Sequence, residues 1–201
     1  HINQYFELQE DIKEKEKNLE KEKELGLLAK EDLANRCEKK AEMFKIDYKN
    51  DSAAYYLELR ASLDTTNIDW QLEAGNFTQK YLANYDKALE YYNCALQNAI
   101  AQYSGHHVAV ALIYNNIGVV LDNQGNYNDA LNYHQKALEI YLQIYGESHP
   151  DVAHSYNSIG IGYYYQGNYN EALAYLQKAL EIRLQLYGES HPDVAHSYNS
   201  I

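Results

Sequence analysis

Apolar and small residues recur at spacings of three and four along most of the chain, which places them on one face of an α-helix. Between Pro150 and Gln166 this stripe predicts one helix, and the polar turn residues that follow it predict where the helix ends. A second stripe runs from Tyr169 to about Tyr187, where Gly188 is a suitable left-handed helix terminator. The pattern therefore predicts a helix, a tight turn and a second helix.

This helix pair is repeated along the chain. Residues 149–159 are identical to residues 191–201, an offset of 42 residues, and the Gln-Gly-Asn-Tyr turn at 166–169 matches residues 124–127. A fainter copy of the second helix begins at Tyr85. A repeat of this length predicts a solenoid, in which each unit buries its apolar face only against its neighbours. The predicted fold class is therefore all-α.

We expect four helix pairs, the first of them degenerate, followed by the opening helix of a fifth, with the bounds 27–65, 66–106, 107–148, 149–190 and 191–201. Since a single helix leaves an apolar face uncovered, we expect the chain to be a fragment of a longer array. Gly118 and Gly160 should occupy matching places where helices approach closely. Residues 1–26 are rich in charge and predict a helical linker or an N-terminal helix extension, with a dimeric coiled coil as the alternative.

The spaced large, small and aromatic residues of each pair resemble the signature of the tetratricopeptide repeat (TPR) family. In the fourth unit they are Tyr156, Ile159, Gly160, Tyr163, Gly167, Asn168, Tyr169, Ala172, Tyr175, Ala179 and Leu180. The third unit repeats most of them between Tyr114 and Leu138. The period of 42 and the linker Tyr-Gly-Glu-Ser-His-Pro-Asp-Val-Ala are similar to the kinesin-light-chain type, including its bacterial relatives. The resemblance implies a right-handed superhelical solenoid of helix-turn-helix repeats.

The resemblance also implies a binding surface, because the first helix of each TPR unit lines a concave wall on which extended peptides commonly dock. The candidate partner-binding residues carried over by alignment are Trp70, Glu73, Phe77, Lys80 and Tyr81, then Leu112, Asn115, Val119, Asp122 and Asn123, then His154, Asn157, Ile161, Tyr164 and Tyr165, and finally Asn199. Asn115, Asn157 and Asn199 predict a ladder of exposed amides that pair with a peptide backbone. The alternative is that these amides only cap or solvate the helix, and binding on the convex wall also stays open.

Charge narrows the class of partner. The formal net charge is −12, most of it after residue 50, and such a surface repels nucleic acids and anionic membranes. Most of the tyrosines fall at packing positions of the repeats, which disfavours a stacking platform for single-stranded nucleic acid. Lys80 is the only basic candidate on the wall, so a clamp for an acidic peptide tail is not expected. We expect a protein or extended peptide that is basic or neutral and has apolar anchors.

Signals for catalysis are nearly absent. The sequence has no phosphate-binding loop, no dinucleotide fingerprint and no His-Glu-x-x-His motif, so we expect neither enzyme activity nor a cofactor or metal. His149 and His191 share a linker position and predict helix caps. Cys37 and Cys94 predict small buried side chains in a reducing cytoplasm, with no membrane span. The predicted function is a non-catalytic protein-interaction scaffold; the alternative is a self-associating or regulatory arm of a larger signalling or effector protein.

Overall fold

A computed structural model of the chain describes residue 17 and residues 30–103 and 105–201. The helix predicted for residues 1–26 lies outside this part of the chain, with the exception of Lys17. The described residues form helices only, and their bounds are α2 Lys30–Ile46, α3 Asn50–Leu63, α4 Ile68–Leu82, α5 Tyr85–Tyr103, α6 Val108–Asn123, α7 Tyr127–Tyr145, α8 Pro150–Tyr165, α9 Tyr169–Tyr187 and α10 Pro192–Ser200. The prediction of an all-α repeat fold is confirmed. None of the described helices is long and apolar enough to cross a membrane.

The chain divides into two compact units, residues 1–63 and 64–201. In the first unit, α2 and α3 pack as a hairpin whose core contains Cys37, Phe44 and Tyr56. The rings of Phe44 and Tyr56 stack with centroids 5.8 Å apart. Burial in this core raises the pKa of the Cys37 thiol, which keeps it protonated, as expected for a small packing residue.

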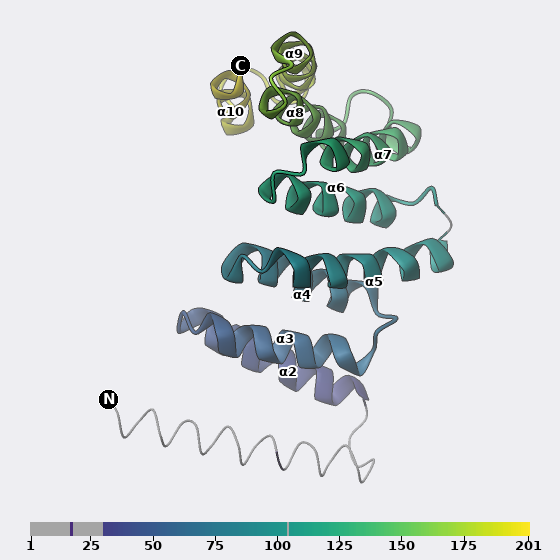
Figure 1. The fold of residues 1–201 in the computed structure, drawn as a ribbon, viewed down its shortest axis with the longest axis vertical. Coiled ribbons are helices and arrows are strands. Elements are labelled where there is room, and N and C mark those ends of the chain that lie inside the picture. The colour runs from purple at the N-terminus through teal and green to yellow at the C-terminus, as the bar shows by residue number, and fades with distance from the viewer. Residues whose placement is uncertain (1–16, 18–29, 104) are drawn as a thin grey trace. The chain divides into compact units, whose positions relative to one another are not determined.

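The second unit contains three helix hairpins, α4–α5, α6–α7 and α8–α9, followed by α10 (Figure 1). Each hairpin packs against the next, α5 on α6 and α7 on α8, and α9 packs on α10. Successive first helices also touch, α4 with α6 and α6 with α8. One core runs through all three hairpins, from Leu72 through Tyr92, Ile117 and Leu138 to Ile159. No hairpin could enclose this core alone, which is the physical basis of a solenoid.

Histidines cap three first helices, as predicted for two of them. His107, His149 and His191 each accept a hydrogen bond through Nδ1 from the backbone N–H two residues ahead, at 3.2 Å. Each imidazole also stacks on the tyrosine four residues earlier, with ring centroids 4.1, 3.7 and 4.2 Å apart. The linker between repeats is therefore held by a stacked pair and a cap at the same place each time.

The turns inside the hairpins also tie neighbouring repeats together. Gln124 donates from Nε2 to Oδ1 of Asp86 at 3.0 Å, and Gln166 donates from Nε2 to Oδ1 of Asn128 at 2.7 Å. Glycine follows the glutamine in both turns with a positive φ, near 80°. The repeated Gln-Gly-Asn turn thus reverses the chain and binds the preceding repeat.

Candidate functional site

Glycines on three first helices face one recurring position of the second helix. A Cβ added to Gly75, Gly118 or Gly160 would lie 2.7, 2.6 or 2.7 Å from a side-chain atom, and the side chains met are those of Tyr92, His134 and Leu176. These three residues are spaced 42 apart. Gly118 and Gly160 therefore occupy matching places, as the sequence predicted.

The second repeat has a different register from the one carried over by alignment. Gly75 precedes Gly118 by 43 residues, whereas Gly118 precedes Gly160 by 42. The cause is the turn between α4 and α5, which has two residues where the later turns have three. Ala83 takes the left-handed conformation there, with φ of 49°, in place of the glycine of the later turns.

This shift moves every position predicted on α4 by one residue. The residues equivalent to the α6 set are Asp69, Leu72, Asn76, Gln79 and Lys80, in place of Trp70, Glu73, Phe77, Lys80 and Tyr81. Burial agrees, since Phe77 is only 4% exposed and belongs to the core. Alignment at a constant period missed Asp69; the missing turn glycine is the sequence signal that could have revealed the shift.

The amide ladder is not an exposed surface. Asn115 and Asn157 are 6% and 5% exposed, so the interpretation of both as exposed amides is wrong. Asn115 Oδ1 lies 2.9 Å from His134 Nδ1, and Asp122 Oδ2 lies 3.0 Å from the other ring nitrogen. In the fourth repeat Leu176 replaces that histidine, and Asn157 Oδ1 has no hydrogen-bond partner among the described residues. Only Asn199, on α10, is exposed.

A polar contact also fills this position in the second repeat. The hydroxyl of Tyr92 lies 2.7 Å from Asn76 Oδ1 and 2.8 Å from Gln79 Oε1. Burial raises the pKa of Tyr92 above its usual range, so the phenol stays protonated. These part-buried contacts hold the first and second helices of this repeat together.

The remaining predicted residues of α6 and α8, together with the shifted set on α4, form what we call the inner wall, the solvent-facing side of the first helices. Its members are Asp69, Asn76, Gln79 and Lys80 on α4, Leu112, Val119, Asp122 and Asn123 on α6, and His154, Ile161, Tyr164 and Tyr165 on α8. Val119, Asp122, Ile161 and Gln79 are half-buried, and the others are exposed. Their alternation with core residues follows from the helical period.

Tyrosines gather at the end of α8. Tyr164, Tyr165 and Tyr169 are 56%, 57% and 63% exposed, which is high for aromatic side chains. Tyr165 stacks on Tyr127 with centroids 5.0 Å apart, and Tyr164 meets Tyr165 and Tyr169 edge to face at 5.6 Å each. We call these four residues the tyrosine cluster. It offers ring faces and hydroxyls together, the combination found at protein interfaces.

His154 is exposed on the inner wall, yet its surroundings lower its pKa. The largest cause is desolvation by the surrounding protein, followed by the electrostatic effect of Arg183, while Asp151 acts in the opposite direction. A side chain can be open to solvent on one side and still be enclosed by protein on the others, as on the inside of a curved wall. His154 is therefore uncharged at neutral pH.

The pKa of His154 predicts a pH dependence of stability. Because the unfolded chain, with a histidine pKa near 6.5, binds the proton more tightly, the free energy of unfolding should fall as the pH drops through about 6.5 and below. His154→Gln should lose less stability than the wild type between neutral pH and the folded pKa, measured by urea unfolding. His106→Gln, at another exposed histidine, controls for the loss of an imidazole. Coincident profiles for His154→Gln and the wild type would contradict the lowered pKa.

Within the described residues, no group of three or more histidine, cysteine or carboxylate side chains could hold a metal ion. Cys37 is buried and Cys94 half-buried, and Cys94 Sγ contacts the carbonyl oxygen of Thr65 at 3.3 Å.

Comparison with known proteins agrees with the repeat geometry. A family model described as the tetratricopeptide repeat matches residues 70–143, 110–185 and 151–201. A search of curated protein sequences finds no significant match.

Several solved structures share the fold. BtubC (BKLC) from P. vanneervenii is 20% identical, with a TM-score of 0.73, over 96% of this chain and 81% of its own. The apo form of RapI is 22% identical, with a TM-score of 0.74, over 95% of this chain and 51% of its own. A Podosopora anserina putative kinesin light chain with nearly identical TPR-like repeats is 14% identical, with a TM-score of 0.66, over 83% and 85%. At these identities the likeness is one of fold.

Proposed function

Because this chain belongs to the tetratricopeptide repeat family, whose members are generally protein-interaction scaffolds, we propose that it is a non-catalytic scaffold. Its ligand is a protein or extended peptide segment that lies along the inner wall. First helices of successive repeats touch each other, so the inner wall is a continuous surface that crosses from α4 to α6 to α8.

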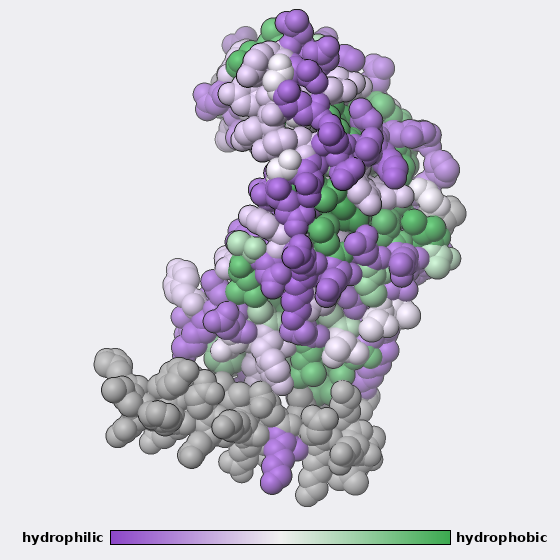
Figure 2. All heavy atoms as spheres, viewed as in Figure 1, coloured by the Kyte–Doolittle hydropathy of each residue, from purple (hydrophilic) through white to green (hydrophobic). Residues whose placement is uncertain are grey.

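The tyrosine cluster is the observation that carries this proposal. Three of its rings are more than half exposed, on a molecule whose surface shows both hydrophilic and hydrophobic areas (Figure 2). Aromatic side chains dominate the binding energy of protein interfaces because they bury a large area with little loss of rotamer entropy. The rings of Tyr164 and Tyr165 support each other edge to face, so their arrangement is set before a partner arrives.

Charge supports a partner that is basic or neutral and carries apolar anchors. The net charge of −12 attracts a basic segment at long range and repels nucleic acid and anionic lipid. Two free cysteines fit the reducing cytoplasm as the place of action. Self-association as an arm of a larger signalling protein stays a prediction, and sedimentation velocity over a range of concentrations would test it.

The test is a selection from a random peptide library on the immobilised chain, followed by fluorescence anisotropy with the selected peptide. Replacing Tyr164 and Tyr165 together with alanine should weaken binding at least about tenfold, since interface aromatics cost about 1 kcal/mol or more each when truncated. Leu173→Ala with Leu186→Ala is the matched control, because these leucines are exposed on the second helix α9. Loss of binding in the α9 variant alone would place the ligand on the opposite wall and overturn the proposal.

A further inference from the structure

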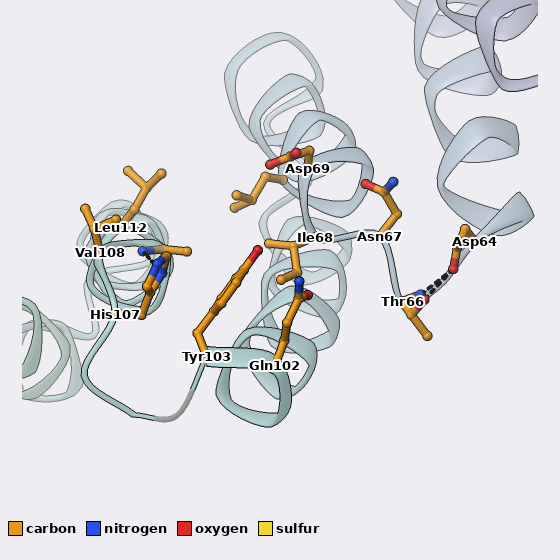
Figure 3. A pocket seen from close by; sticks show the side chains of 12 residues that line it. Asp64, Thr66, Asn67, Ile68, Asp69, Gln102, Tyr103, His107, Val108 and Leu112 are labelled. Carbon is orange, nitrogen blue, oxygen red and sulfur yellow. Dashed lines mark hydrogen bonds between the residues drawn. The ribbon is translucent and has the colours of Figure 1, made fainter. Parts of the chain in front are cut away.

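A cavity of about 580 Å³ lies between the N-terminal ends of α4 and α6 and the C-terminal end of α5 (Figure 3). Its size is within the range of about 300–1,000 Å³ that is usual for ligand pockets. Ile68 and Leu72 come from α4, Tyr103 from α5, and Val108 and Leu112 from α6. Leu112 and Asp69 also belong to the inner wall, so the cavity lies at one end of that wall.

The polar part of the cavity is acidic. Asp64 and Asp69 line it, and none of its lining residues in the described chain is a lysine or arginine. Its one histidine, His107, accepts a hydrogen bond at Nδ1 from Ala109 N, so that nitrogen carries no proton. Asp69 is exposed in the first turn of α4. The charged side chains of the lining are therefore two carboxylates and no cation, and Asp64 Oδ1 already accepts hydrogen bonds from Thr66 N and Oγ1. The remaining lining is apolar apart from Thr66, Asn67, Gln102 and His107.

An anion is a poor occupant despite the two helix N-termini. Each N-terminus contributes about half a positive charge, and the C-terminal end of α5 contributes about half a negative charge. The negative charge of the carboxylates is larger than the net positive charge of these three helix ends. Side chains also occupy N–H groups that an anion would need, since Asn67 Oδ1 accepts from Trp70 N at 3.0 Å and His107 caps α6.

We propose that the cavity binds a cationic side chain, arginine or lysine, of a partner peptide. The hydrocarbon stem would lie on Ile68, Leu72 and Leu112, and the charged group would face Asp69. A purely apolar side chain would remove water from the Asp69 carboxylate without compensating its charge, which is costly. This inference rests on the proposed function, of which it specifies one anchor of the ligand.

The acidic cavity belongs to one junction of the array. Leu112 in the third repeat and His154 in the fourth stand at the position of Asp69, and Ile144 stands at the position of the lining residue Gln102. The next junction thus lacks the equivalent carboxylate. A peptide with one basic residue would therefore be held in a single register, with that residue at the α4–α6 end.

The experiment is a titration of the ¹⁵N-labelled chain with blocked single amino acids, followed by backbone NMR shifts. N-acetyl-arginine amide and N-acetyl-lysine amide are the probes, while the norleucine and glutamate analogues test the apolar and anionic alternatives. We expect saturable shifts for one or both cationic probes, with a dissociation constant on the order of millimolar, confined to residues 66–72 and 102–112. Comparing the affinities of the arginine and lysine probes shows whether the cavity prefers a guanidinium or an ammonium group.

Two variants sharpen the test. Asp69→Asn should weaken binding of the cationic probe about fivefold, the effect of one charge at contact distance in water. Glu139→Gln is the matched control, because Glu139 is exposed on α7 and lies outside the cavity. Leu112→Lys places a cation at the mouth of the cavity and should abolish binding even if Asp69→Asn disturbs the helix start.

The assignment is overturned if the norleucine or glutamate analogue binds as tightly as the arginine probe. It is also overturned if neither Asp69→Asn nor Leu112→Lys changes the affinity for the cationic probes. The proposed function fails separately. Library peptides that bind the tyrosine cluster while no cationic probe enters the cavity would leave the scaffold standing and remove this anchor. If cationic probes bind the cavity but no library peptide is selected, the cavity assignment stands and the proposed function fails.

Discussion

Gly118→Leu is expected to lower the free energy of unfolding by about 1–3 kcal/mol, the usual cost of overpacking a core. A Cβ at residue 118 would lie 2.6 Å from His134 Cε1. The imidazole cannot simply move aside, because Asn115 and Asp122 hold both of its nitrogens. Gly160→Leu should also destabilise, since its Cβ would lie 2.7 Å from Leu176 Cγ and 3.2 Å from the backbone oxygen of Ala172.

Urea unfolding followed by circular dichroism measures the loss. Gly105→Leu is the control, because a Cβ at Gly105 would meet no atom within 4 Å. It should change the midpoint little. If Gly118→Leu and Gly160→Leu unfold at the wild-type midpoint, the register of the first helices against the second helices is wrong.

The two equivalent asparagines should respond to the same substitution with opposite signs. Asn115→Leu leaves His134, which is fully buried, with an unpaired ring nitrogen and should cost about 1–3 kcal/mol. Asn157→Leu removes a buried oxygen that has no partner among the described residues and should stabilise the fold by up to about 1 kcal/mol.

The same unfolding measurement decides this prediction. Leu176→His provides a further check. It places a histidine in the fourth repeat at the position that His134, the partner of Asn115, has in the third repeat. In that background Asn157→Leu should lose its stabilising effect. Shifts of the same sign for Asn115→Leu and Asn157→Leu in the otherwise native chain would show that the two amides do not differ in pairing.

The inner wall could be predicted in part. The family resemblance, carried along the period of 42 residues, places Leu112, His154, Tyr164 and Tyr165 on the first helices, and all four are exposed there. The same alignment failed on α4, where Phe77 is in the core and Asp69 is on the wall. A constant offset cannot register a turn that is one residue shorter, and so the cavity beside Asp69 could not be foreseen.

By itself the sequence determined the repeating helix hairpins, the histidine caps at His149 and His191, and the close approach at Gly118 and Gly160. These features depend on the spacing of residues along one helix and on the intrinsic properties of single residues, such as the small size of glycine or the capping ability of histidine. Only the tertiary structure decided that Asn115 Oδ1 has a buried partner, whereas Asn157 Oδ1 has none among the described residues. The period of a helix tells which residues share a face, but the side chain that covers that face belongs to another helix, here His134 or Leu176.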